Sequence, residues 1–265
     1  MSKLAFIFPG QGAQKAGMGK DFYENSEAAR SFFDHAQEIL DFDLKEMCFG
    51  EHEELNLTEY TQPCMVSVCL AIVQELKKRG INPDITAGLS LGEYAAVAAA
   101  GGMNELDAIK LVRRRGILMQ NTVPTGEGAM AAVLGLDAKK IEEILESFEN
   151  VWIANYNCPG QIVITGLTNE VKQASLALKE AGAKRVVELK VSGPFHSLLL
   201  KPAGEALLKE MESMSFSPLQ VPYIANATAE IVTDSKKIST FFARGIYSSV
   251  RWQQSIETML ENGVD

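Results

Sequence analysis

The segment Gly88-Leu89-Ser90-Leu91-Gly92 constrains the fold more than any other feature of the sequence. It matches the pattern G-x-S-x-G, which places a serine on a sharp turn between a strand and a helix. The flanking residues predict both elements, with a short buried strand at 84–88 and an alanine-rich helix that ends at Gly101-Gly102. A strand that leads directly into a helix is typical of an α/β fold with a parallel sheet.

The N-terminal part of the chain predicts a further strand and several helices. The run from Leu4 to Phe8 is apolar at every position, so it predicts a strand buried on both faces. Apolar residues at helical spacing follow at 61–79, and Asn104 is expected to cap a helix that runs to about Gln120. Residues 21–47 have a helical but less regular pattern.

The pattern changes after about residue 127, where short strands alternate with helices. We therefore predict a ferredoxin-like α+β subdomain at 127–191, inserted into a larger α/β domain made of residues 1–126 and 192–265. The predicted elements are strands at 129–136, 151–155, 161–165 and 184–191, helices at 138–148 and 169–181, and a turn at 157–160.

The charge balance limits the classes of partner. The 265 residues include 25 Lys and Arg and 34 Asp and Glu, so the formal net charge is −9. Binding of nucleic acid irrespective of sequence needs a basic surface, and the run Arg113-Arg114-Arg115 is short. No apolar stretch approaches the length of a membrane span. We therefore expect neither nucleic acid nor a membrane as a partner.

The cysteines and histidines do not indicate a metal site, because none of them stands at zinc-ligand spacing. We expect reduced, buried thiols in a cytoplasmic protein, and the N-terminal apolar run is too short for a signal peptide. These residues are Cys48, Cys64, Cys69, Cys158, His35, His52 and His196.

Two residues are candidates for covalent catalysis. Ser90 is expected at the N-terminus of a helix, where the positive end of the helix dipole lies; the alternative is a serine that only caps that helix. A serine nucleophile needs a base. Since His35 is expected on a helix surface and His52 in a charged loop, the preferred base is His196, in a loop after the predicted strand 184–191.

Arg115 stands out because 3-4 spacing places it on the apolar stripe of the helix that begins at Asn104. Arg114, in contrast, falls on the polar face with Lys110. A buried guanidinium is costly unless it is paired. Either an acidic side chain of this protein pairs with Arg115, or the guanidinium binds a substrate carboxylate through two hydrogen bonds.

A glycine-rich loop, Gly10-Gln11-Gly12, follows the first predicted strand. It is not a phosphate-binding loop, since neither G-x-x-x-x-G-K-[ST] nor G-x-G-x-x-G occurs there. The backbone N–H or the side chain of Gln11 is a candidate donor to an oxyanion.

Four motifs occur in order along the whole chain: F-P-G-Q-G-A-Q at 8–14, G-L-S-L-G-E at 88–93, the pair Arg115-Gly116, and G-P-F-H-S at 193–197. Together they resemble those of the malonyl-CoA:acyl carrier protein transacylase family, which includes the acyltransferase domains of fatty acid and polyketide synthases. The resemblance implies a hydrolase-like α/β core with a parallel sheet and an inserted ferredoxin-like subdomain, in agreement with the predicted elements.

The resemblance also implies roles for individual residues. It makes Ser90 the acyl-bearing nucleophile, His196 its base and Arg115 the ligand of the malonyl carboxylate. The backbone N–H groups of Gln11 and Leu91 form the implied oxyanion hole. A backbone carbonyl near Val250-Arg251-Trp252, rather than an aspartate, is implied to orient the histidine.

The implied reaction moves a malonyl group from malonyl-CoA to the phosphopantetheine thiol of acyl carrier protein, through a malonyl-serine intermediate. It needs no cofactor of the enzyme, because CoA and phosphopantetheine arrive on the substrates, and we expect a monomer. Arg113 and Arg114 are candidates for contact with the acidic carrier. Asn155 and Asn157 are candidate pocket residues, although Asn157 equally fits a turn.

The chain departs from the family pattern at Leu89, where histidine is common, and at Pro194, where a small residue is usual. Phe195, which accompanies malonyl specificity in relatives, is retained. Family members continue past the position of Asp265 with a strand, a glycine-rich loop and a helix, so we expect this sequence to be a partial chain.

Alternative functions follow from the same residues. A separate acyltransferase that acts in trans on a polyketide synthase uses the same chemistry as one of fatty acid synthesis. A serine esterase or thioesterase shares the G-x-S-x-G pattern. An esterase of neutral esters leaves Arg115 without a role. A protein that only docks a carrier is expected to lack Ser90 or His196, and both are present.

Overall fold

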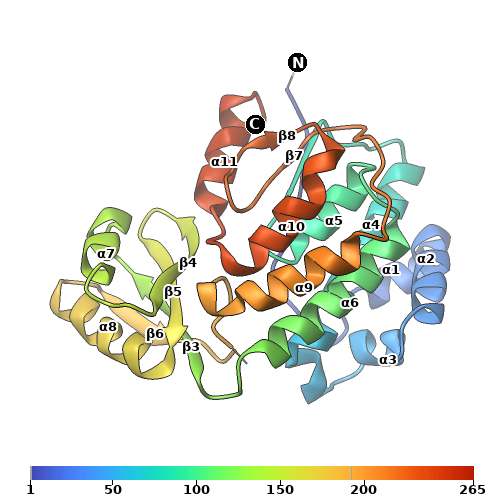
Figure 1. Ribbon diagram of the computed structural model, residues 1–265. Helices are drawn as coiled ribbons and strands as arrows, with labels where there is room; N and C mark the ends of the chain where they lie inside the picture. Colours follow the sequence, from blue (N-terminus) through green and yellow to red (C-terminus); the bar gives the residue numbers. More distant parts are fainter. Residues whose placement is uncertain (1, 192) are drawn as a thin grey trace.

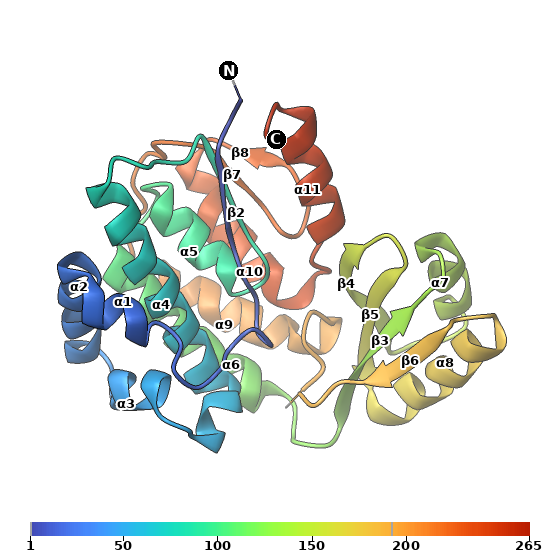
Figure 2. The same ribbon diagram turned by 180° about the vertical axis from the view of Figure 1, so that it is seen from behind.

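The computed structural model describes residues 2–191 and 193–265. Figures 1 and 2 show a larger body built around one sheet and a smaller body, with β3 to β6, that lies beside it. The larger body contains β1 (Ala5–Phe8), α1 (Lys20–Asn25), α2 (Glu27–Glu38), α3 (Leu44–Phe49), a 3-10 turn (Glu53–Asn56), α4 (Thr58–Lys78), β2 (Ile85–Gly88), α5 (Gly92–Ala99) and α6 (Glu105–Thr122). The smaller body contains β3 (Gly128–Leu134), α7 (Ala138–Leu145), β4 (Val151–Cys158), β5 (Gln161–Leu167), α8 (Thr168–Glu180) and β6 (Arg185–Glu188). The chain then returns to the larger body with two 3-10 turns (Leu198–Leu200 and Ser235–Lys237), α9 (Lys201–Met211), β7 (Tyr223–Ile224), β8 (Ile231–Val232), α10 (Ile238–Tyr247) and α11 (Trp252–Glu261).

The sheet of the larger body has the strand order β1-β2-β7-β8. Its first three strands are parallel, with Phe8 opposite Gly88 and Ala87 opposite Ile224, and β8 is antiparallel to β7. The helix α5 packs on one face, and α11 contributes Met259 to a small apolar cluster on the other. The predicted parallel sheet of an α/β fold is therefore confirmed.

Strand β1 differs from the prediction of a strand buried on both faces. It lies at the edge of the sheet, and its partner β2 is buried at all four positions. Ala5 packs against the apolar cluster that contains Met259 of α11, but Ile7 remains 56% exposed and Leu4 45% exposed. An apolar run thus identified the strand correctly, whereas its position at the edge left part of one face uncovered.

The second sheet is antiparallel throughout and has the order β4-β5-β3-β6. The helices α7 and α8 cover one face and close a separate apolar core that includes Val133, Ile141 and Ile164. This arrangement confirms the predicted ferredoxin-like subdomain. Strand β4 continues through Asn157 to Cys158, so the predicted turn at 157–160 was too long.

Boundaries differ elsewhere by a few residues. Residues 21–47 form parts of three short helices, because Ser26 and Asp43 each cap a new one through a side-chain oxygen. Strand β6 ends at Glu188, before the predicted end at 191. The predicted return to the larger domain falls at residue 192, which lies outside the described residues.

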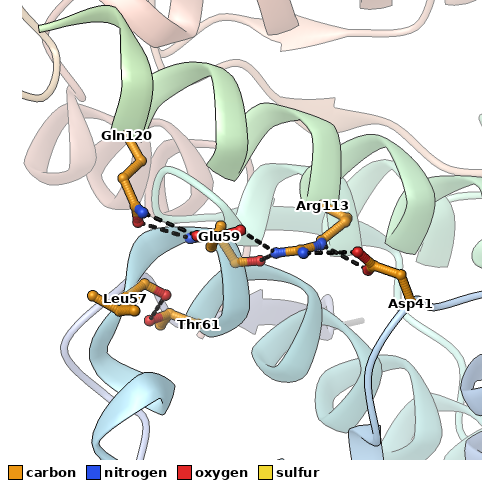
Figure 3. A network of polar contacts seen from close by, with 6 residues as sticks. All are labelled: Asp41, Leu57, Glu59, Thr61, Arg113 and Gln120. Carbon is orange, nitrogen blue, oxygen red and sulfur yellow. Dashed lines mark hydrogen bonds and ion pairs between the residues drawn. The ribbon is translucent and has the colours of Figure 1, made fainter.

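A polar network joins α6 to the start of α4 (Figure 3). The guanidinium of Arg113 donates to both carboxylate oxygens of Asp41 and to the backbone carbonyl and the carboxylate of Glu59. Gln120 also donates to Glu59 at 3.0 Å. Between these contacts, Gly116 packs so closely that an added Cβ would lie 2.8 Å from the Cα of Glu59. The network and the glycine fix how deeply α6 sits against α4.

Other sequence expectations concern metals, thiols and membranes. In the part of the chain that the structure describes, no group of three or more His, Cys, Asp or Glu residues is placed to hold a metal. The four cysteines are free: Cys48 and Cys64 are buried and Cys69 is half-buried, but Cys158 is exposed, contrary to the expectation of buried thiols. Among the described helices, none has the length and apolar character needed to cross a bilayer.

Candidate active site

Ser90 lies on a tight turn between β2 and α5, in the left-handed region with φ of 54°. The two motif glycines permit this turn. A Cβ at Gly88 would lie 2.0 Å from the backbone of Gly92, and a Cβ at Gly92 would lie 2.5 Å from the carbonyl oxygen of Phe8. The G-x-S-x-G pattern therefore reflects close approach of three backbone segments, and the serine side chain remains half-buried at the end of the sheet.

His196 lies beside Ser90 although the two are 106 positions apart in the chain. Its Nε2 is 2.9 Å from the Oγ of Ser90, and its Nδ1 is 2.9 Å from the backbone carbonyl oxygen of Gly245 in α10. A carbonyl only accepts hydrogen bonds, so Nδ1 carries the proton and Nε2 is free to accept one from the serine. The orienting group is thus a backbone carbonyl, as expected, and it belongs to Gly245, shortly before the segment Val250-Arg251-Trp252.

The imidazole of His196 is 5% exposed. Burial, together with the positive charge of Arg115, lowers the pKa of the imidazole to about 3, although hydrogen bonds to the backbone of Gly245 and Ser248 raise it. The histidine is therefore neutral at physiological pH and able to act as a base.

Arg115 is the largest of the fully buried side chains, with 2% exposure. One terminal nitrogen donates to the Oγ of Ser90 at 3.1 Å, and the guanidinium carbon lies 5.4 Å from the centre of the Tyr94 ring. No described carboxylate forms an ion pair with it, and its Nε has no acceptor among the described residues. The buried carboxyl group of Glu93 acts on the pKa of Arg115 through its charge but forms no ion pair with it, so the reading of Arg115 as half of an ion pair within the protein is wrong.

The loop after β1 brings Gln11 into the wall of the same cavity as Ser90, and Leu91 follows the serine directly at the start of α5. Gln11 anchors its side chain by donating to the hydroxyl of Thr58 at 3.2 Å. Neither the backbone N–H of Gln11 nor that of Leu91 donates to another group in the described part of the chain. The two N–H groups predicted as an oxyanion hole are thus unused in this structure.

A cavity of about 200 Å³ opens in front of Ser90, between the two bodies of the protein. The smaller body contributes Asn155 and Asn157 of β4 to its wall, so Asn157 is a pocket residue and not a turn residue. Phe195 also lines it. The buried Oδ1 of Asn157 and Oε1 of Gln62 accept no hydrogen bond from any described group, which leaves polar atoms available to a ligand. Gln62 was missed by sequence reasoning because it lies on the buried face of an ordinary helix.

The arginine run does not form one basic patch. Arg113 is buried in the network of Figure 3, with its guanidinium also over the ring of Tyr60 at 4.7 Å. The candidate contact between Arg113 and an acidic carrier is therefore wrong. Arg114 is half-exposed and pairs with Glu210 of α9, as its predicted place on the polar face indicates.

Two buried polar residues behind Ser90 were given no role from the sequence. Asn226, just after β7, accepts from the backbone N–H of Ser90 and donates to the carbonyl of Gly88. Glu93 in α5 accepts from the backbone N–H of Asn226, and burial raises the pKa of its carboxyl group to about 8. Glu93 ends the quoted motif at 88–93, whereas no local pattern marks Asn226.

Comparisons with known proteins find relatives over nearly the whole chain. The model of a family described as "Acyl transferase domain" matches residues 5–265. The malonyl CoA-acyl carrier protein transacylase of Bacillus subtilis is 45% identical over 269 aligned positions, which cover 100% of this chain and 85% of that protein. An acyl carrier protein S-malonyltransferase from Vibrio cholerae superimposes with a TM-score of 0.96 at 41% identity, over 99% of this chain and 88% of that one. A malonyl-transacylase solved in complex with a type II polyketide acyl carrier protein gives a TM-score of 0.96 at 38% identity, over 99% and 87% of the two chains.

Proposed function

The chain belongs to the acyl transferase family, and from this premise we propose that it transfers malonyl groups from malonyl-CoA to the phosphopantetheine thiol of acyl carrier protein, for fatty acid biosynthesis. The observation that carries this proposal is the position of Arg115. A buried guanidinium without a carboxylate partner donates to the Oγ of Ser90. An acyl group attached to Ser90 that ends in a carboxylate supplies the missing partner.

In the first half of the reaction, Ser90 becomes acylated. The Oγ of Ser90 gives its proton to Nε2 of His196 and attacks the thioester carbonyl of malonyl-CoA. The backbone N–H groups of Gln11 and Leu91 stabilise the oxyanion. When the carbon–sulfur bond breaks, the CoA sulfur takes the proton from His196, and a malonyl-serine ester remains.

In the second half, the thiol of the carrier enters the place that CoA has left. His196 takes the thiol proton, the sulfur attacks the ester carbonyl, and the same two N–H groups stabilise the oxyanion. The Oγ of Ser90 leaves with the proton from His196, which regenerates the enzyme and yields malonyl-carrier. The carbonyl of Gly245 holds the imidazole in the required tautomer through both halves.

Arg115 disfavours the esterase alternative. A buried cation beside the nucleophile is costly, and a neutral ester has no charge with which to pair it. A polyketide carrier would use the same steps, since only the identity of the thiol differs. The similar malonyl-transacylase that was solved with a type II polyketide acyl carrier protein is an example of an enzyme in complex with such a carrier.

We further propose that the protein acts as a monomer in the cytoplasm, without nucleic acid or a membrane as partner. One chain supplies Ser90, His196 and Arg115, so no second copy is needed to complete the site. The net charge of −9 disfavours binding to nucleic acid. Proton transfer and ester formation need only the side chains described, so no resident cofactor is proposed.

Mass spectrometry of the intact protein tests the proposal. After mixing with malonyl-CoA, the wild type is expected to gain one malonyl group on Ser90 and to lose it when holo-carrier is added. Ser90→Ala is expected to gain none. An adduct that persists on the alanine variant contradicts the assignment of the nucleophile. If holo-carrier removes the adduct no faster than buffer alone does, the protein is a hydrolase.

A further inference from the structure

The turn that carries Ser90 needs support from outside its own segment. A residue other than glycine in the left-handed region costs about 1–3 kcal/mol and persists only where the surroundings hold it. From the side of β1, the carbonyl of Phe8 accepts from the N–H of Leu89 at 3.0 Å. From the side of β7, both contacts come from the side chain of Asn226.

The amide of Asn226 binds the backbone on either side of Leu89. Its Oδ1 accepts from the N–H of Ser90 at 2.6 Å, and its Nδ2 donates to the carbonyl of Gly88 at 2.6 Å. The orientation of the amide is unambiguous, because an N–H only donates and a carbonyl only accepts. If β7 continued as a parallel strand, the backbone of the residue opposite Leu89 would bond to the same two groups, the carbonyl of Gly88 and the N–H of Ser90. The side chain therefore extends the parallel ladder of β2 and β7 past Ile224, where β7 ends.

Asn226 is itself fixed in place. Its backbone N–H donates to Oε1 of Glu93 at 3.2 Å, and its carbonyl accepts from the N–H of Arg251 at 2.9 Å. With 2% exposure, the side chain has no water competing for its hydrogen bonds. All four polar groups of the residue are thus used, and two of them hold the serine turn.

We propose that Asn226 is a positioning residue of the transfer reaction, whose side-chain amide holds the Ser90 turn so that Oγ faces His196 and the N–H of Leu91 faces the carbonyl under attack. This inference rests on the proposed role of Ser90 as the nucleophile. Asn226 does not line the cavity, so it acts through Ser90 and Leu91 and not on the substrate. Its loss slows acylation of every acyl donor alike, because Arg115 is untouched.

Two variants and one control test the role. Asn226→Leu removes both side-chain hydrogen bonds at similar size, and Asn226→Asp keeps the acceptor for the N–H of Ser90 but faces the carbonyl of Gly88 with a second oxygen. Phe33→Leu is the control, since it perturbs a buried position in α2, away from the cavity. For each protein, the melting temperature, the single-turnover acylation rate and KM with malonyl-CoA, and the malonyl-to-acetyl preference are measured. The rate of Ser90 labelling by phenylmethanesulfonyl fluoride, which carries no carboxylate, is measured as well.

Misplacing a reacting atom by about 1 Å costs on the order of 100-fold, so Asn226→Leu is expected to lose about that factor in acylation. Asn226→Asp is expected to lose less, and both are expected to label more slowly with the sulfonyl fluoride. KM and the malonyl-to-acetyl preference are expected to stay at wild-type values. The control is expected to acylate normally even where its melting temperature falls as far.

Several results overturn the inference. One is wild-type acylation in both Asn226 variants, and another is a loss of rate that the Phe33 control reproduces at equal loss of stability. A rise in KM with an unchanged rate constant also overturns it. If the leucine variant does not fold, the aspartate variant decides.

Failure of the proposed substrate can be told apart from failure of the positioning role. If the wild type accepts the sulfonyl fluoride but no malonyl group, the proposed substrate is refuted, whereas slower labelling of the Asn226 variants still supports the positioning role. A wild type that accepts neither reagent refutes both.

Discussion

Removing the guanidinium of Arg115 is expected to change the choice of acyl group more than the stability of the protein. The side chain is 2% exposed, donates to the Oγ of Ser90 and forms no ion pair with a described carboxylate. A malonyl group on Ser90 brings a carboxylate to this cation, whereas an acetyl group brings none. The variants Arg115→Ala and Arg115→Lys separate the charge from the planar shape of the guanidinium.

The magnitude follows from the burial of the charge. Truncating one partner of a buried, hydrogen-bonded charge pair costs about 2–4 kcal/mol. At about 1.4 kcal/mol per decade, this corresponds to roughly a 30- to 1000-fold loss of kcat/KM for malonyl-CoA in Arg115→Ala. The acetyl-CoA reaction is expected to stay constant or to rise, because the desolvated charge is gone. Arg115→Lys is expected to restore little, since an ammonium cannot reproduce two parallel hydrogen bonds.

The assay compares kcat/KM for malonyl-CoA and acetyl-CoA in the wild type, the two variants and Arg114→Ala. Arg114 is the matched control, because it is the preceding residue of α6 and pairs with Glu210 at the surface. Thermal unfolding gives a second readout. Breaking a buried ion pair costs about 3–5 kcal/mol, but Arg115 has no such pair to break. A third variant for thermal unfolding alone, Arg115→Met, is therefore expected to be at least as stable as the wild type.

Two outcomes would refute this reasoning. If the malonyl and acetyl activities fall together, Arg115 has a structural role and does not select the substrate. If the wild type prefers acetyl-CoA, the assignment of malonyl as the transferred group fails as well.

Two further predictions concern His196. His196→Ala is expected to slow acylation and transfer by roughly 10²–10⁴-fold, measured by single-turnover kinetics, and near-normal turnover would place the base elsewhere. Because burial and the charge of Arg115 lower the pKa of His196 to about 3, the imidazole stays neutral as the pH falls through its ordinary value. We expect kcat/KM to change by less than about twofold between pH 7.5 and 5.5. A base with the ordinary pKa of about 6.5 would instead lose about tenfold over this range. Such a loss would show that His196 is not held in its uncharged form.

The parts of the fold that could be predicted are those with a strong local pattern. The strand-turn-helix at Ser90 was marked by two glycines that the packing requires. The ferredoxin-like subdomain was marked by its alternation of short strands and helices. Arg115 was placed in the core by 3-4 spacing alone, and its burial is confirmed. In each case the pattern that carried the prediction lies within a short stretch of sequence.

The parts that could not be predicted depend on contacts across long stretches of chain. Strands β7 and β8 have two residues each, too few for any periodic pattern. Asn226 meets Ser90 across 136 positions, and the group of Gly245 that orients His196 is a backbone carbonyl, which every residue type has. The exposure of Ile7 was missed because an apolar run does not say whether its strand lies in the centre or at the edge of a sheet.

The site depends on two supports that reach Ser90 from different elements. Ser90, the proposed nucleophile, is held from the side of β7 through Asn226, which bonds to the backbone of Gly88 and Ser90. The guanidinium of Arg115, which we propose binds the acyl carboxylate, is held by α6, whose depth is set by Gly116 and by the network of Arg113. A change in the first support alters the geometry of attack for every acyl group. A change in the second alters the free energy of one acyl group relative to another, because it moves the buried charge while the turn of Ser90 stays bonded to β7. Of the two supports, α6 therefore sets the substrate choice, whereas the reaction rate depends on both, because Arg115 also donates to the Oγ of Ser90 and lowers the pKa of His196.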